Sequence, residues 1–111
     1  MIDIDVETLA DGVGVVRPHG RLTMVAARRM RELLADLVAA GSTRVVVDLS
    51  ATEFMDSSGL GAIIAGLKTA RQAGGDLRLA AVTEPVMAVL QLTNMDRVLR
   101  ARPSVEEAFR D

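Results

Sequence analysis

The feature that most constrains the fold is a run of apolar, β-branched residues that leads through a short loop into a helix with a polar start. Residues 45–50 read Val-Val-Val-Asp-Leu-Ser, and residues 56–61 read Asp-Ser-Ser-Gly-Leu-Gly. The apolar run predicts a strand that is buried on both faces, as in a parallel sheet. Sites of open α/β sheets form at the carboxyl ends of such strands and at helix N-termini. The segment after residue 50 is therefore the first candidate for a functional site.

Strand and helix patterns alternate along the first two thirds of the chain. Residues 2–18 predict a β-hairpin around an Asp-Gly turn. An amphipathic pattern predicts a helix over residues 24–40, with Thr23 as its N-cap and Gly41 at its end. A second helix is predicted over residues 57–73, where a Gly-Gly pair follows.

The last third of the chain predicts shorter elements. These are a strand over residues 77–82, a helix that opens with Thr-Glu-Pro at residues 83–85, a brief strand at residues 98–99, and a C-terminal helix that opens with a capping box at residues 104–107. The order ββαβαβα(β)α predicts an α/β fold, with a mixed four- to five-stranded sheet and about four helices. We find no repeat or linker, so a single domain over residues 1–111 is expected.

Composition argues against several classes of function. The net charge is −2 and only two residues are aromatic, so neither a basic surface nor a stacking platform for nucleic acid is indicated. One histidine and no cysteine leave little with which to bind a metal. The N-terminal segment is acidic, unlike a signal peptide, and no apolar run reaches membrane-spanning length. We expect a cytoplasmic protein without membrane insertion and without a cofactor.

The tetrapeptide Asp-Ser-Ser-Gly at residues 56–59 has two interpretations. Aspartate and serine are common N-caps and glycine relaxes a tight turn, so such a tetrapeptide is usually structural. Here, however, two serines and an aspartate exceed what one cap needs. Gly59 and Gly61 also leave the first turn bare where better helix formers are usual, which would admit the active site of another protein. Either serine, Ser57 or Ser58, could then be the functional hydroxyl.

Residues 48–50 (Asp-Leu-Ser) and 54–61 (Phe-Met-Asp-Ser-Ser-Gly-Leu-Gly) together resemble the signature of the STAS domain. The resemblance is closest to the stand-alone anti-sigma factor antagonists of bacteria. The predicted element order, the turn from Gly20 to Leu22 and the Gly-Gly helix exit at residues 74–75 also match that family. The resemblance therefore extends over nearly the whole chain.

This resemblance implies a function. The protein would bind an anti-sigma factor that is itself a serine kinase of the histidine-kinase-like ATPase type, so that the sigma factor is released. The kinase would switch the antagonist off by phosphorylating Ser58, which matches the phosphorylated serine of the family, and a PP2C-type phosphatase would restore it. Ser57 is the alternative acceptor, and Asp56, Gly59 and Gly61 would support the site.

Five residues are candidates for contact with the partner: Arg21, Thr23, Met55, Leu60 and Met95. A methionine is by default a filler of the core, and Arg21 could equally be a solvated surface residue. Thr23 departs from the family pattern, since antagonists usually carry an aspartate after this turn, near the phosphorylation site. The departure leaves open which kinase the protein fits. Thr23 could equally be only a helix N-cap.

The sequence is also compatible with two other functions. A STAS subunit of a membrane transporter or lipid-transport ATPase complex would share the fold, but the Asp-Ser-Ser-Gly turn favours the sigma pathway. A hydrolase that uses Ser58 would be an enzyme of a different class. The single histidine, His19, has no evident nucleophile or acid beside it in the sequence, which argues against catalysis. The prediction is a binding module that is not an enzyme.

Overall fold

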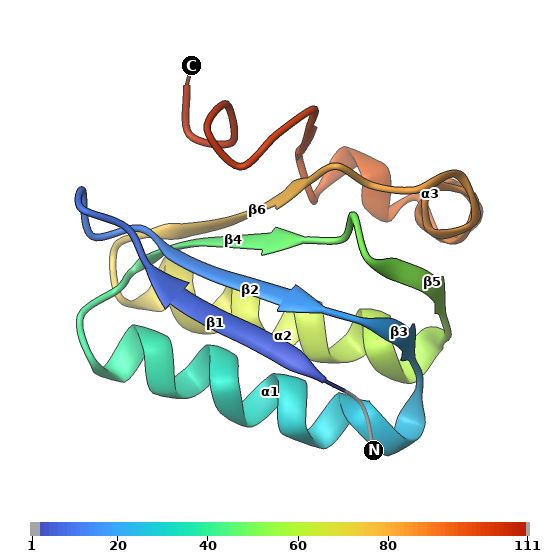
Figure 1. The fold of residues 1–111 in the computed structure, drawn as a ribbon, viewed down its shortest axis with the longest axis horizontal. Coiled ribbons are helices and arrows are strands. Elements are labelled where there is room, and N and C mark those ends of the chain that lie inside the picture. Colours follow the sequence, from blue (N-terminus) through green and yellow to red (C-terminus); the bar gives the residue numbers. More distant parts are fainter. Residues whose placement is uncertain (1–2, 111) are drawn as a thin grey trace.

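The computed structural model describes residues 3–110, which form a five-stranded sheet with helices packed against it (Figure 1). The sheet has the order β1-β2-β4-β6-β7. Its strands are β1 (Ile4–Thr8), β2 (Gly14–Pro18), β4 (Arg44–Asp48), β6 (Asp76–Ala80) and β7 (Ala101–Arg102). β1 runs antiparallel to β2, and every other neighbouring pair is parallel. The predicted mixed sheet and N-terminal hairpin are confirmed, although Ile2 lies outside the described residues.

The central strand β4 is buried on both faces, as its sequence predicts. Val45, Val46 and Val47 have no exposed surface. Val45 and Val47 belong to the core cluster that includes buried residues of the helices, whereas Val46 belongs to a second cluster that includes Ala108 near the C-terminus. Because successive side chains of a strand point to opposite faces, both faces of β4 must be covered.

Helices α1 (Met24–Ala39) and α2 (Ser57–Gln72) cover one face of the sheet and run side by side (Figure 1). Their bounds agree with the predicted helices to within a residue. A Cβ atom on Gly66 would lie 2.6 Å from a methyl carbon of Leu34, so the missing side chain lets the two helices pack closely. Gly41 has a φ of 106°, the left-handed conformation expected where α1 ends.

The C-terminal segment covers the opposite face of the sheet, but it is not the predicted helix (Figure 1). The capping box at residues 104–107 opens a series of turns instead. Arg78 of β6 donates a hydrogen bond to the carbonyl oxygen of Ala108 at 3.1 Å, and its guanidinium lies 4.6 Å from the centre of the Phe109 ring. So short a segment has little intrinsic helix stability, and its contacts with the sheet decide its shape.

The segment before β7 also differs from the prediction. α3 (Glu84–Leu92) opens with Pro85 in its first turn, as expected, and a 3₁₀ turn, η1 (Met95–Arg97), follows it. The brief strand expected at residues 98–99 lies further along the chain as β7, which pairs with β6 from Ala101 onward, and Leu99 is fully buried in the core. Within residues 3–110, no helix is both long enough and apolar enough to cross a membrane.

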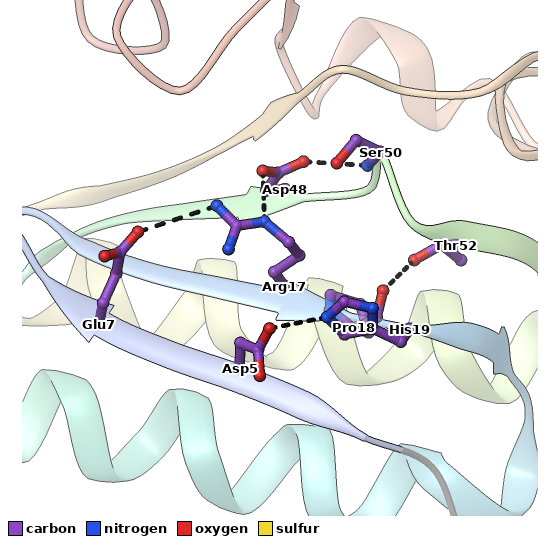
Figure 2. Close-up of polar contacts among 8 residues, drawn as sticks. All are labelled: Asp5, Glu7, Arg17, Pro18, His19, Asp48, Ser50 and Thr52. Atoms are coloured by element: carbon purple, nitrogen blue, oxygen red, sulfur yellow. Dashed lines mark hydrogen bonds and ion pairs between the residues drawn. The ribbon is translucent and has the colours of Figure 1, made fainter.

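Two short strands were missed from the sequence. β3 (Gly20–Leu22) and β5 (Thr52–Met55) pair in parallel as a separate two-stranded sheet, where a turn and a loop were expected. The Oγ1 of Thr52 donates a hydrogen bond to the carbonyl oxygen of Pro18 at 2.9 Å, which joins this small sheet to the end of β2 (Figure 2). Pairing between segments so far apart in the chain leaves no local pattern in the sequence.

An ion pair fixes the end of β4 (Figure 2). The Nε of Arg17 donates to Asp48 Oδ2 at 2.8 Å, and the backbone N–H of Ser50 donates to Asp48 Oδ1 at 2.9 Å. Burial by itself would raise the pKa of Asp48, but the bonds from Ser50 and Arg17 outweigh it and hold this pKa below its usual value. The pair therefore holds the turn through which the chain passes from β4 to β5.

This arrangement gives the first prediction. Asp48→Asn should lower the free energy of unfolding by about 1–3 kcal/mol near neutral pH, because a partly buried charge pair is lost. The pKa of Asp48 is lower in the folded state, so its contribution is complete above its unfolded pKa of about 4 and is lost as the pH falls through the folded value. Urea unfolding near neutral pH and at about pH 3 should show a smaller gap between wild type and variant in acid. Asp36→Asn, on the exposed side of α1, is the control. A gap that does not narrow in acid would contradict the prediction.

Candidate functional site

The small sheet brings the N-termini of two helices together. β3 leads into α1 and β5 leads into α2, and the two strands are parallel, with Leu22 opposite Met55. Both helices therefore start at the same end of the molecule and run in the same direction (Figure 1). The segment that the sequence analysis singled out, residues 56–61, lies at this end beside the start of α1.

The carboxylate of Asp56 caps both helices. Its Oδ1 accepts a hydrogen bond from the backbone N–H of Gly59 at 2.9 Å, and its Oδ2 accepts one from the backbone N–H of Met24 at 3.1 Å. Thr23 stands at the N-cap position of α1, as predicted, but its side chain makes no capping hydrogen bond. Asp56 thus satisfies one unpaired backbone donor in the first turn of each helix.

A groove of about 380 Å³ lies between the first turns of α1 and α2, and we call it the serine groove. It is lined by Met24, Ala27, Arg28, Arg31, Ser57, Ser58 and Gly61. Ser57 is exposed and Ser58 is half-buried, and within residues 3–110 neither hydroxyl makes a hydrogen bond. Both predicted hydroxyls are therefore open to a partner in one depression of the surface.

Two arginines of α1 make the serine groove cationic. Arg28 is 3.4 Å from the carboxylate of Glu32, and its side chain is 89% exposed. Arg31 makes no ion pair or hydrogen bond through its side chain within residues 3–110. Its Nη2 atom lies 4.0 Å from the point that a Cβ atom on Gly61 would occupy, so Arg31 extends across the groove toward α2. No pattern in the sequence marks either arginine, because only packing brings them into the groove with Ser58.

The two glycines of the first turns of α2 have different roles. Gly59 is buried, and a Cβ atom there would lie 2.2 Å from the carbonyl oxygen of Leu22, so packing against β3 requires glycine. Gly61 lines the groove, where an added Cβ would meet nothing closer than Arg31. The expectation that glycine leaves a bare surface thus fits Gly61, whereas Gly59 has a reason inside the fold.

The residues expected to contact a partner are not all at the surface. Arg21 is exposed, and its guanidinium lies 4.7 Å from the centre of the Phe54 ring, an aromatic contact that no local pattern predicts. Met55 and Leu60 are buried in the core, with 1% and 5% of their surface exposed, and offer no contact surface. The fifth expected residue, Met95, is half-buried in η1 and does not line the serine groove.

His19, the single histidine of the sequence, is paired with Asp5. The Nε2 of His19 lies 2.7 Å from Asp5 Oδ2 of β1 (Figure 2), and no hydrogen bond joins His19 to Ser58 within the described residues. A serine nucleophile needs a base within hydrogen-bond reach. Residues 3–110 also contain no group of three histidine, aspartate or glutamate side chains placed to hold a metal ion. The site offers hydroxyls that another protein could bind or modify.

Comparison with known proteins gives consistent matches. Residues 4–108 match the STAS domain family. A protein of Thermotoga maritima is 30% identical over 104 residues, which cover 93% of this chain and 92% of that protein. The anti-sigma-F factor antagonist RsfB of Mycobacterium tuberculosis is 29% identical over 106 residues, which cover 92% of this chain and 84% of that one.

Solved structures of other proteins are also similar to this one. The crystal structure of an anti-sigma factor antagonist from Mycobacterium paratuberculosis aligns with a TM-score of 0.84 at 29% identity, covering 96% of this chain and 90% of that one. A sulfate transporter family protein from Wolinella succinogenes shares the fold alone, with a TM-score of 0.77 at 17% identity over 92% of this chain and 85% of that one.

The two glycines give a matched pair of variants. Gly59→Ala should lower the free energy of unfolding by about 1–3 kcal/mol, because the new methyl group would overlap the backbone of β3. Gly61→Ala should leave stability unchanged or raise it by up to about 1 kcal/mol, because alanine favours a helix and the space is open. Chemical denaturation of both variants tests this difference in sign. Equal destabilisation by both would contradict it.

Proposed function

Because the chain belongs to the STAS domain family, we propose that it is an anti-sigma factor antagonist, a phosphorylation-gated binding module without catalytic activity of its own. Its unphosphorylated form binds an anti-sigma factor that is a serine kinase with a histidine-kinase-like ATPase fold, and the sigma factor is then released. The observation that carries the proposal is the serine groove, in which Ser57 and Ser58 lie open beside a helix N-terminus. The names of the relatives support the same role. We expect the protein to act in the cytoplasm.

The switch is a phosphoryl transfer to Ser58. The Oγ of Ser58 attacks the γ-phosphorus of ATP bound to the kinase, and an O–P bond forms. The bond from that phosphorus to the β–γ bridging oxygen breaks, ADP leaves, and the hydroxyl proton passes to a base of the kinase. A PP2C-type phosphatase reverses the switch by hydrolysing the phosphoserine. The product carries a charge of about −1.5 to −2 and three new acceptor oxygens.

The fold should tolerate this modification, whereas the interface should not. The Ser58 side chain is only half-buried and holds no hydrogen bond of the fold, so the phosphate can extend into the open groove. A partner seated on the groove would have to desolvate the phosphate close to the carboxylate of Asp56, which costs several kcal/mol unless cations compensate. Phosphorylation therefore acts on binding rather than on folding.

The proposed contact surface surrounds the groove. Met24 has 73% of its surface exposed and lies at the start of α1, and Phe54 has 39% exposed beneath the guanidinium of Arg21. Thr23 is half-buried beside them. Aromatic and methionine side chains with a neighbouring arginine are typical of the centre of a protein interface. We propose that Arg21 and Thr23, with these apolar neighbours, contact the kinase.

The choice between the two serines can be tested directly. Incubation with the purified kinase and ATP should phosphorylate the wild type and Ser57→Ala to the same extent, and Ser58→Ala should not be modified. Intact-mass spectrometry gives the readout. Modification of Ser58→Ala together with loss of modification in Ser57→Ala would move the acceptor to Ser57.

Binding gives a second test. Ser58→Asp should keep the unfolding midpoint of the wild type but bind the kinase about 100-fold more weakly or worse, because the partner would have to desolvate the added carboxylate close to that of Asp56. Gln72→Glu, which adds the same charge at the exposed far end of α2, should bind like the wild type. A pull-down from host lysate with all three proteins, followed by mass spectrometry, identifies the kinase, and titration measures the affinity.

Two results would contradict the proposal. Tight binding of Ser58→Asp to the kinase would remove the phosphoserine switch. Equal retention of transporter components by wild type and Ser58→Asp would instead support a transporter subunit, the alternative with which this chain shares its fold.

A further inference from the structure

A phosphate on Ser58 would lie near the carboxylate of Asp56, which already accepts hydrogen bonds from the N-termini of both helices. Asp56 accepts the backbone N–H of Gly59 in the first turn of α2 and that of Met24 in the first turn of α1. Backbone donors that could stabilise an added anion at these helix ends are thus partly occupied, and the helix dipole is already opposed by a carboxylate. A neighbouring cation would therefore stabilise a phosphate of charge about −2 here beyond what the helix end provides.

One arginine of the serine groove could pair with such a phosphate. Arg31 lines the groove together with Ser58 and makes no side-chain ion pair or hydrogen bond within residues 3–110. Its Nη2 atom lies 4.0 Å from where a Cβ of Gly61 would be. Gly61 follows Ser58 by three positions, so the two residues share one face of α2. Arg28, the other arginine of the groove, faces the carboxylate of Glu32 at 3.4 Å instead.

We propose that Arg31 binds the phosphate of phosphorylated Ser58, so that the modified serine of α2 is tied to α1 across the serine groove. This inference rests on the proposed function, since it requires modification of Ser58. The planar guanidinium matches the phosphate oxygens and forms charge-assisted hydrogen bonds with them. The contact would cover the groove and withdraw Arg31 from any partner. Glycine at position 61 keeps open the path that the Arg31 side chain follows.

The contact can be measured without a partner protein. Phosphoserine is incorporated at position 58 of the full chain during translation, and its second ionisation is followed by ³¹P NMR as a function of pH. A neighbouring guanidinium favours the dianion and lowers its pKa. Arg31→Gln should therefore raise this pKa by about half a pH unit, because the pairing cation is removed. Arg31→Lys should restore part of the shift.

Two further variants test whether the phosphate pKa depends on Arg31 itself or on any positive charge nearby. Arg28→Gln, the matched control on the same helix, should change the phosphate pKa far less than Arg31→Gln. Gly61→Leu, which fills the path of Arg31 but keeps its charge, should raise the pKa as Arg31→Gln does. An unchanged pKa in Arg31→Gln, or an equal change in Arg28→Gln, would overturn the inference. Kinase binding is not part of this readout, so failure of the proposed function would be seen in the binding experiment and not here.

Discussion

Burial of β4 on both faces sets the arrangement of the helices and of the C-terminal segment around the sheet. Its three valines are inaccessible to solvent, and they alternate between the two core clusters of the molecule. One face requires α1 and α2, and the other requires the C-terminal segment with Ala108. Because β2, β4 and β6 are parallel, each connection between them must cross over, and the helices α1 and α2 make these crossovers. Burial of this one strand thus requires a helical layer on one face of the sheet and the C-terminal segment on the other.

The same constraint places the candidate site. Each crossover leaves the carboxyl end of a strand, and β3 and β5 guide the chain from there into the two helices. Their parallel pairing sets the helix starts side by side, where the single carboxylate of Asp56 caps both. The hydroxyl of Ser58 and the guanidinium of Arg31 then line one groove. The site is thus built on the starts of two helices, and sites on helices and strands are positioned more precisely than sites on loops.

Local patterns in the sequence predict those structural elements whose stability depends mainly on neighbouring residues. Hydrophobic periodicity located α1 and α2 to within a residue, and glycine marked the end of α1. The helix predicted from the capping box at residues 104–107 does not form, because the contacts of Arg78 with Ala108 and Phe109 outweigh the helix preference of a short segment. Met55 and Leu60, two of the candidates for contact with a partner, are buried in the core.

The fold class, the central strand, the two long helices and the position of Ser58 at a helix start can all be predicted from the amino-acid sequence alone. These follow from residue type, periodicity and capping chemistry, which act over a few neighbouring residues. The capping of a second helix by Asp56 and the place of Arg31 in the groove with Ser58 arise from packing between distant segments. Gly59 likewise owes its role to the backbone of Leu22. Each of these joins segments about 30 residues apart, and such contacts exist only once the sheet has packed.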